Sequence, residues 1–198
     1  MKNSGVNCIV LDRDGVINED SPDYIRGLDD WRPIPGSIKA IADLSLAGFS
    51  IIVATNQSGI ARGLFSLADM QAIHSRLHQL VAAKGGAIAG IYYCPHRPED
   101  DCDCRKPGVG LLQVAEQELG ISLRDAWFVG DRITDLQTAV AFGCKPVLVK
   151  TGRGATTLEA LHAEPAYTAP CNGLCIYDDL AAVAHSLLSK EPAPIGDR

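Results

Sequence analysis

Short apolar runs alternate with helical stretches along this chain, and this alternation constrains its fold more than any other feature. Each run is continuous in hydrophobic residues, which is typical of a strand whose two faces are both covered. The predicted strands are 6–11, 50–54, 88–93, 126–129 and 146–149, and the predicted helices are 36–48, 66–84, 107–119, 134–142 and 178–189. Because strands that alternate with helices pair in parallel through right-handed crossovers, we expect an α/β fold with a Rossmann-like parallel sheet and helices on both faces.

The length of 198 residues fits one domain, which we expect at residues 1–189, followed by a flexible tail at 190–198. The longest stretch without periodicity is 18–35, and long connections of this kind often act as lids or binding loops. No segment between the predicted elements is long enough for a large additional cap domain. We therefore expect a small, open site.

The composition excludes several classes of protein. Hydrophobic residues make up 46% and charged residues 21% of the chain, which is typical of a folded protein rather than a disordered one. The formal net charge of −6 disfavours non-specific binding to nucleic acid, but it does not exclude an anionic small-molecule substrate. Because no apolar run is long enough for a membrane helix or a signal peptide, we expect a cytoplasmic protein without a membrane partner. We also expect a monomer, although no motif in the sequence indicates the oligomeric state.

Carboxylates lie directly after two of the predicted strands. Asp12 and Asp14 follow the first strand and Asp131 follows the fourth, so they meet at one edge of a parallel sheet. Hard cations such as Mg²⁺ prefer oxygen ligands of this kind, together with phosphate oxygens of a substrate. Thr55 follows the second strand, and Lys106 lies just before a predicted helix start, where an anion is favoured. The simpler interpretation of each motif alone is a turn or a helix cap, but their coincidence at matching strand ends favours a phosphoryl-transfer site.

Three of the seven cysteines lie within residues 94–104. The pattern C-x-H-x5-C-x-C supplies three thiols and an imidazole, a donor set typical of a four-coordinate structural Zn²⁺. The predicted zinc ligands are Cys94, His96, Cys102 and Cys104. Buried free thiols and a redox role are the alternatives, although a redox pair more often shows C-x-x-C and this loop is strongly polar. Cys8 and Cys144 are predicted core residues, whereas Cys171 and Cys175 fit a helix or loop without an assigned role.

The ordered motifs resemble those of the haloacid dehalogenase superfamily of phosphohydrolases. The matching segments are Asp12-Arg13-Asp14-Gly15-Val16, Thr55-Asn56-Gln57-Ser58-Gly59, Lys106 and Gly130-Asp131…Asp135. The resemblance implies the haloacid dehalogenase fold, with Asp12 as a nucleophile that forms an aspartyl-phosphate and Asp14 as the general acid and base. It also implies that Thr55 and Lys106 hold the phosphoryl group, with Asp135 supporting the site from behind the metal ligands. The implied Mg²⁺ ligands are Asp12, Asp14 through its backbone carbonyl, and Asp131.

The zinc loop narrows the resemblance to the branch of this superfamily that hydrolyses heptose bisphosphates or histidinol phosphate. The segments that carry it are Tyr-Tyr-Cys-Pro-His, Cys-Asp-Cys-Arg-Lys-Pro and Thr-Asn-Gln-Ser-Gly-Ile-Ala-Arg-Gly. The heptose members imply removal of the C7 phosphate of D-glycero-D-manno-heptose 1,7-bisphosphate in lipopolysaccharide or surface-glycan synthesis, with the anomer left open. Histidinol phosphate is the alternative substrate, and a zinc-stabilised binding module without activity is the rival of another class.

The same resemblance implies a set of substrate contacts. They are Asp20, Tyr24, Asn56, Gln57, Ser58, Arg105 and Arg132. Arg105 is adjacent to Lys106 and suits the second phosphate of the sugar, because its planar guanidinium can donate two parallel hydrogen bonds.

Overall fold

The computed structural model describes residues 7–163 and 173–189. Within these residues, six strands form one parallel sheet in the order β3-β2-β1-β4-β5-β6. The strands are β1 (Cys8–Leu11), β2 (Ser50–Asn56), β3 (Gly90–Cys94), β4 (Trp127–Gly130), β5 (Lys145–Val149) and β6 (Cys175–Tyr177). The predicted α/β fold with a Rossmann-like parallel sheet is confirmed, with one strand more than the sequence indicated.

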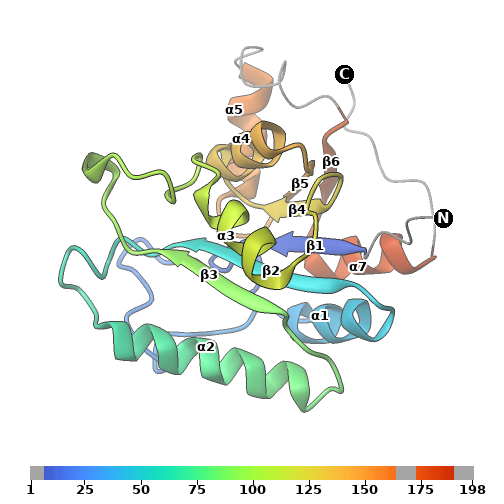
Figure 1. Ribbon diagram of the computed structural model, residues 1–198, viewed down its shortest axis with the longest axis horizontal. Coiled ribbons are helices and arrows are strands. Elements are labelled where there is room, and N and C mark those ends of the chain that lie inside the picture. The colour runs from blue at the N-terminus through green and yellow to red at the C-terminus, as the bar shows by residue number, and fades with distance from the viewer. Residues whose placement is uncertain (1–6, 164–172, 190–198) are drawn as a thin grey trace.

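Helices cover both faces of the sheet, as predicted. They are α1 (Ser37–Leu46), α2 (Leu67–Ala82), α3 (Gly110–Leu119), α4 (Ile133–Phe142), α5 (Gly154–Ala163) and α7 (Leu180–Ser189), with a short 3-10 helix at Pro98–Asp100. One layer contains α1, which contacts both α2 and α7. The opposite layer contains α3, α4 and α5, which pack on strands β2 to β5. In Figure 1, α1 and α2 lie below the sheet and α4 and α5 lie above it.

The start of α2 shows how the local sequence sets a helix boundary. Ser66 accepts a hydrogen bond from the backbone N–H of Asp69 at 3.2 Å, and the Asp69 carboxylate accepts one from the N–H of Ser66 at 2.8 Å. This reciprocal capping box satisfies backbone donors that the first helical turn leaves free. Met70, Ile73 and Leu77 then follow at helical spacing and are buried against the sheet layer.

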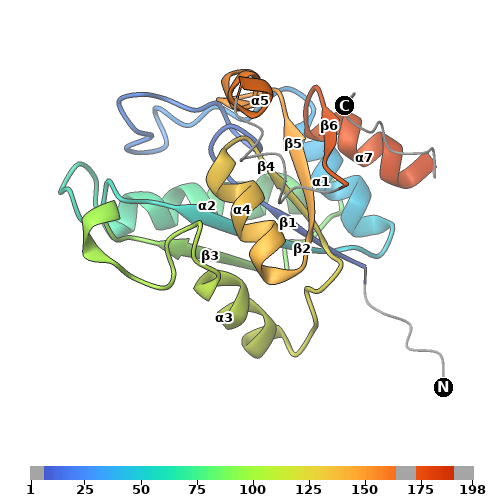
Figure 2. The same cartoon turned by 90° about the horizontal axis from the view of Figure 1, so that it is seen from above.

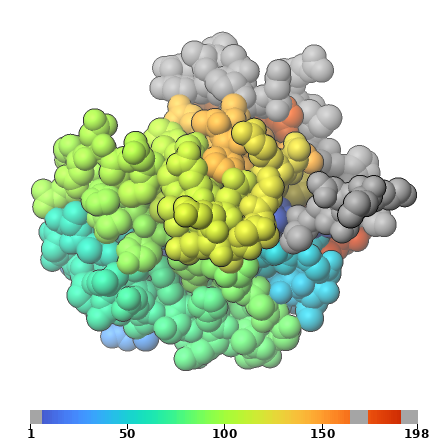
Figure 3. All heavy atoms as spheres, viewed as in Figure 1, coloured from blue at the N-terminus to red at the C-terminus, as the bar shows by residue number. Residues whose placement is uncertain are grey.

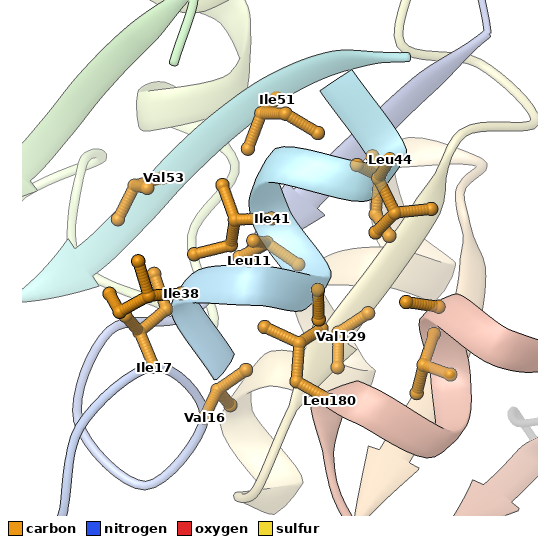
Figure 4. Close-up of a cluster of buried hydrophobic side chains, with 14 of the residues drawn as sticks. Leu11, Val16, Ile17, Ile38, Ile41, Leu44, Ile51, Val53, Val129 and Leu180 are labelled. Carbon is orange, nitrogen blue, oxygen red and sulfur yellow. The ribbon is translucent and has the colours of Figure 1, made fainter. Parts of the chain in front are cut away.

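The larger hydrophobic core lies between the sheet and the layer of α1, α2 and α7. Figure 4 shows Ile38, Ile41 and Leu44 of α1 directed toward the strands. Successive β1 residues alternate between the two faces, because Leu11 belongs to this cluster and Val10 to the cluster beneath α3. Both side chains are fully buried. The central strands are therefore packed on both faces and form a firm base for the loops that follow them.

Two elements, α5 and β6, are absent from the sequence prediction. The first turn of α5 reads Gly-Ala-Thr-Thr, and glycine and threonine are weak helix formers. β6 has only 3 residues, which is too short for a periodic signal. Cys175 is a buried residue of β6, so the expectation of a helix or loop there is wrong. Cys171 and the predicted tail at 190–198 lie outside the described residues.

The beginning of α3 also differs from the prediction. The helix starts at Gly110 instead of residue 107, because a turn intervenes in which the N–H of Gly108 donates to the carbonyl of Arg105 at 2.7 Å. Lys106 therefore lies within this turn, and the prediction that it lies at a helix start is wrong. Its ammonium group is instead surrounded by the Asp12 and Asp135 carboxylates and the carbonyl of Ala54.

All six strands point their carboxyl ends to the same side of the sheet, and the loops after β1, β2 and β3 extend from that side (Figure 2). The connection from β1 to α1 contains no helix or strand, in agreement with the aperiodic stretch predicted at 18–35. None of the helices in the described ranges combines the length and the apolar character that crossing a bilayer requires.

Candidate active site

A cleft of about 670 Å³ lies at the carboxyl end of the sheet. All the residues predicted to act in catalysis, phosphoryl binding or substrate contact line this cleft, and Asp131 is buried beside Asp12 and Asp135 at its floor. In the space-filling view of Figure 3, the turn after β2 and the loop after β3 lie side by side at one end of the molecule. The cleft is therefore built from segments that are far apart in the sequence.

Asp12 and Lys106 form the centre of the cleft floor, and both are buried. Lys106 Nζ lies 2.9 Å from Asp12 Oδ1 and 2.7 Å from Asp135 Oδ1, and it donates to the carbonyl of Ala54 at 2.8 Å. Burial raises the pKa of Asp12 to about 6 against the lowering effect of Lys106, and Asp135 adds to the rise. Burial lowers the pKa of Lys106, but the two carboxylates outweigh it, so the net shift is upward. A fixed ammonium group thus stands beside a carboxylate, ready to neutralise an incoming phosphoryl group.

Three carboxylates converge next to this lysine. One oxygen each of Asp12, Asp131 and Asp135 lies within 4.8 Å of the other two. Asp131 Oδ1 is buried and has no hydrogen-bond partner among the residues that the structure describes. Burial is the largest cause that raises the pKa of Asp131 to about 8, and the negative charges of Asp12 and Asp135 add to the rise. One lysine does not balance three carboxylates, so the group fits a cation that prefers oxygen ligands.

The loops after β1 and β5 and the first turn of α5 hold Asp131 in place. The N–H of Arg153 donates to Asp131 Oδ2 at 2.8 Å, and the Thr157 hydroxyl donates to the Asp131 carbonyl at 2.7 Å. Gly15 and Gly152 have φ of +85° and +58° and pack closely around the carboxylate. A Cβ on Gly152 would lie 2.5 Å from the Gly15 Cα and closer still to Asp131 Oδ2. Only glycine fits both the backbone conformation and the space.

Asp14 is held by several hydrogen-bond donors. Its Oδ1 accepts from Arg13 Nη2 and Asn18 Nδ2, both at 2.8 Å, and its Oδ2 accepts from Gln57 Nε2 at 2.8 Å. Burial alone would raise the pKa of Asp14, but the Arg13 guanidinium and the hydrogen bonds from Asn18 and Gln57 overcome burial and lower it. In this arrangement the carboxyl group is ionised.

Arg13 is itself fully buried and reaches a histidine on α2. Arg13 Nη1 lies 3.4 Å from His74 Nε2, and the His74 ring lies 6.2 Å from the Tyr93 ring between centroids. Burial lowers the pKa of His74 to about 4, and Arg13 adds to this effect. The neutral ring can therefore accept from Arg13. Sequence reasoning gave neither residue a role, although a histidine on the buried face of a predicted helix was an available signal.

The turn after β2 positions several groups at once. Gln57 Nε2 donates to Thr55 Oγ1 at 2.9 Å, which leaves the Thr55 hydroxyl proton available. Asn56 Nδ2 donates to the Lys106 carbonyl and Asn56 Oδ1 accepts from the Lys106 N–H, both at 3.1 Å. Asn56 thereby joins the end of β2 to the segment that carries Lys106. Ser58 lines the cleft close by. The predicted contacts of these residues with substrate stay predictions.

The cysteine loop brings its four predicted metal ligands together. Cys94 Sγ lies 3.6 Å from both His96 Nδ1 and Cys102 Sγ, and Cys104 Sγ lies 3.3 Å from His96 Nδ1 and 3.5 Å from Cys102 Sγ. Tetrahedral sulfur ligands at about 2.3 Å from a zinc ion are roughly 3.8 Å apart, and an imidazole nitrogen shortens this slightly. The four atoms therefore have the spacing of a tetrahedral metal site.

This cluster is joined directly to the cleft. Only Arg105 separates Cys104 from Lys106 in the chain. Arg105 Nη1 donates to the carbonyl of His96 at 3.2 Å, so its side chain also rests on the cysteine loop. The position of both cations consequently depends on the conformation of this loop.

Three charged side chains meet in a wall of the cleft. Asp20 Oδ2 accepts from Arg132 Nη2 at 2.8 Å and from Arg153 Nε at 3.2 Å. Tyr24 lies in the same wall, with φ of +67°. Sequence reasoning missed Arg153 and Thr157, because the segment after the fifth strand received no function. The rule that polar residues follow strand ends would have singled out this segment as well.

Comparisons with known proteins agree with the class that the fold and site define. The profile of the HAD-hydrolase-like family matches residues 103–171. The chain is a haloacid dehalogenase-like hydrolase. Hydrolases of this class have a parallel sheet with a buried aspartate, a lysine and further carboxylates at its strand ends, and this chain has the same arrangement.

Relatives of high sequence identity show to which family within this class the chain belongs. The chain is 56% identical over 180 residues to the D-glycero-β-D-manno-heptose-1,7-bisphosphate 7-phosphatase of Pseudomonas aeruginosa, covering 91% of this chain and 97% of that protein. It is 42% identical over 160 residues to the enzyme of the same name from Escherichia coli K12, covering 76% and 83%. The crystal structure of the D,D-heptose 1,7-bisphosphate phosphatase of B. bronchiseptica, complexed with magnesium and phosphate, superposes with a TM-score of 0.85 at 43% identity, covering 93% of this chain and 99% of that one. The chain belongs to the family of these heptose-bisphosphate phosphatases.

Proposed function

We propose that this chain removes the C7 phosphate from D-glycero-β-D-manno-heptose 1,7-bisphosphate in the cytoplasm, as a monomer. The observation that carries the proposal is Asp12, buried against Lys106 beside two further carboxylates on the floor of a cleft. The cleft volume of about 670 Å³ suits a sugar bisphosphate. The names of relatives that are 40% to 56% identical support the substrate and its β anomer.

The chemistry follows from the positions of the two aspartates after β1. A carboxylate oxygen of Asp12 forms a bond to phosphorus while the bond from phosphorus to the sugar oxygen breaks. Asp14 gives its proton to that leaving oxygen. In the second step, Asp14 takes a proton from water, whose oxygen attacks the aspartyl-phosphate and releases inorganic phosphate. Lys106 and the Thr55 hydroxyl donate to the phosphoryl oxygens and neutralise their charge.

Asp14 must carry a proton in the first step and lose it in the second. The donors Arg13, Asn18 and Gln57 favour the ionised form, which suits activation of water. A bound phosphate brings negative charge close to Asp14 and raises its pKa, which suits the first step. The same side chain can therefore act as acid while the substrate is intact and as base after the leaving group has departed.

The carboxylate group fits a magnesium ion. Asp12, Asp131 and the backbone carbonyl of Asp14 would hold it, with the unpartnered Oδ1 of Asp131 as the strongest local indication. The related B. bronchiseptica structure, complexed with magnesium and phosphate, supports this assignment. When bound, such an ion offsets the negative charge of the phosphoryl oxygens. Asp135 pairs with Lys106 and supports the ligands from behind.

The cysteine cluster fits a structural zinc ion. Its ligands would be Cys94, His96, Cys102 and Cys104. Four protein ligands leave no open position for substrate, so the ion would stabilise the loop that carries Arg105 and Lys106. We propose no catalytic step at this metal.

Histidinol phosphate fits the cleft less well. It has a single phosphate and a positively charged amine. Beyond the floor of the cleft, Arg105, Arg132 and Arg153 add positive charge to the walls. These guanidinium groups favour a second anionic group and repel an amine. The curated relatives reported above carry the heptose name as well.

The test is phosphate release from a panel that contains the heptose bisphosphate, histidinol phosphate and simple sugar monophosphates. We expect a kcat/KM at least about 100-fold higher for the heptose bisphosphate than for histidinol phosphate. Asp12→Asn should lower kcat by about 1000-fold or more, because the amide is not a nucleophile, while circular dichroism shows a folded chain.

Asp43→Asn is the matched control, since Asp43 lies on α1 and pairs with Lys39 away from the cleft. Metal analysis of the same preparations should give zinc bound to the wild type and to both variants. Full turnover by Asp12→Asn would contradict the mechanism, and a preference for histidinol phosphate would contradict the substrate.

A further inference from the structure

Two arginines converge on one carboxylate in the wall of the cleft. Arg132 follows β4, Arg153 follows β5, and both donate to Oδ2 of Asp20 in the loop after β1. The Asp20 side chain is 15% exposed, whereas those of Arg132 and Arg153 are 41% and 55% exposed. The carboxylate is therefore the buried partner, and the two guanidinium groups stay open to the cleft.

This trio has more positive charge than Asp20 neutralises. Two guanidinium groups and one carboxylate leave one net positive charge. Within residues 7–163 and 173–189, no partner is recorded for Arg153 Nη1 and Nη2 or for Arg132 Nη1. These N–H groups are free to donate to an oxyanion, and the planar guanidinium matches the spacing of phosphate oxygens.

The main chain fixes Arg153 relative to the reacting carboxylates. Its own N–H donates to Asp131 Oδ2 at 2.8 Å. Two residues earlier, the Thr151 hydroxyl donates to the carbonyl of Gly15 at 2.6 Å, which ties the loop after β5 to the loop after β1. Asp20 restrains the other end of Arg153 by accepting a hydrogen bond from its guanidinium group. The Arg153 guanidinium is thus held at a set distance from the site of phosphoryl transfer. A group that binds a second phosphate of the same substrate requires such a fixed distance.

We propose that Arg153 is a specificity-determining residue that, together with Arg132 and aligned by Asp20, binds the substrate phosphate that is not cleaved. We call these three residues the arginine clamp. The inference rests on the proposed function, because only a substrate with a second anionic group uses the clamp. The class of substrate it selects is a phosphate monoester with a second phosphate on the same small molecule.

Arg105 is the other cation that could serve the same phosphate. The contacts that hold Arg105 differ from those of the clamp, because Arg105 Nη1 donates to the carbonyl of His96 in the cysteine loop. Arg153 instead rests on Asp20 within the cleft and on Asp131 beneath it. Single variants at the two positions therefore separate their contributions.

The experiment compares kcat/KM for heptose 1,7-bisphosphate with kcat/KM for heptose 7-phosphate, which has the same scissile ester but no second phosphate. Arg153→Met removes the guanidinium while keeping an extended side chain and the main-chain bond to Asp131. We expect the ratio of the two kcat/KM values to fall about 10- to 100-fold, mainly through a higher KM for the bisphosphate. Arg153→Lys, which keeps the charge but loses the planar fork, should give an intermediate ratio.

Arg76→Met is the matched control, because Arg76 is exposed on α2 and does not line the cleft. If the wild type prefers the bisphosphate and Arg153→Met keeps the same preference, the clamp is overturned and the proposed function stands. In that case Arg105→Met is expected to lose the preference. A wild type that hydrolyses both substrates equally well would overturn the clamp alone, whereas a wild type that does not hydrolyse the bisphosphate would overturn the proposed function and the clamp with it.

Discussion

At the scale of single residues, the site depends on charges that are buried as well as paired. Lys106 Nζ lies 2.9 Å from Asp12 Oδ1, and Lys150 Nζ lies 2.8 Å from Asp178 Oδ1. The two distances are alike, but the first pair is nearly inaccessible and the second is on the surface. An exposed pair contributes little to stability, whereas removing one member of a buried pair leaves a charge without a partner or water. Substitutions of the site lysine therefore affect folding together with catalysis.

A single buried residue, His74, gives the stability of the folded chain a measurable pH dependence. Burial and Arg13 lower its pKa from 6.5 to about 4 in the folded chain. Below pH 6.5 the unfolded chain takes up a proton that the folded chain does not accept until about pH 4. The stability that is present above pH 6.5 is therefore lost as the pH falls toward 4, by up to about 3 kcal/mol.

His74→Gln should remove this loss, so that its free energy of unfolding falls less between pH 6.5 and pH 4 than that of the wild type. Urea unfolding at several pH values measures the difference. His185→Gln, at an exposed position of α7, controls for the replacement of a histidine as such. Parallel stability curves for the wild type and His74→Gln would contradict the role given to burial.

At the scale of elements, the loops after the strands are tied to one another as well as to the sheet. Two reciprocal hydrogen bonds between Asn56 and Lys106 join the turn after β2 to the end of the cysteine loop. Thr151 joins the loop after β5 to the loop after β1. Catalytic side chains on separate loops can thus keep a common geometry, because each loop is held by its neighbour.

Cys104→Ser tests the cysteine loop as such an element. The hydroxyl is a poor zinc ligand, so we expect metal analysis to show less than half the wild-type zinc content. Loss of the metal should lower Tm by on the order of 10 °C and reduce kcat, because Lys106 lies two residues further along the chain. Cys144→Ala removes a buried thiol outside the cluster and should keep its zinc. Full zinc content with unchanged Tm in Cys104→Ser would contradict the assignment of this ligand.

At the scale of the whole molecule, the sequence predicted the sheet, the floor of the cleft and part of its walls, including Asp20 and Arg132, but it did not predict Arg153. Asp12, Asp14 and Asp131 follow strands with strong apolar runs, so their meeting point could be predicted from parallel topology alone. Arg153 escaped notice because it directly precedes α5, a helix whose first turn has a weak local signal. The partnership of Asn56 with Lys106 joins positions 50 residues apart, and no local pattern indicates such a bond.

Gly152 tests whether the strand ends act as one unit. In Gly152→Ala, the new methyl group would meet Gly15 from the β1 loop and Asp131 from the β4 loop. We expect a loss of several kcal/mol of stability together with a fall in kcat of at least about 10-fold, since the carboxylate must move. Gly63→Ala is a matched control, because its φ of +67° is similar but nothing lies within 4 Å of the added carbon. That control should cost only about 1–2 kcal/mol for the left-handed backbone. Equal effects of the two substitutions in urea unfolding and activity assays would show that close packing at Gly152 is unimportant.

The parallel sheet has a practical consequence for handling the protein. Because all strands point the same way, their amino ends form the rim opposite the cleft. β1 begins at Cys8, and its extended chain rises about 3.3 Å per residue before it reaches Asp12. A fusion partner, an affinity tag or a solid support joined ahead of residue 7 therefore attaches on the far side from the cleft mouth. Capture through this end leaves the cleft facing free solution, where substrate can enter and phosphate can leave.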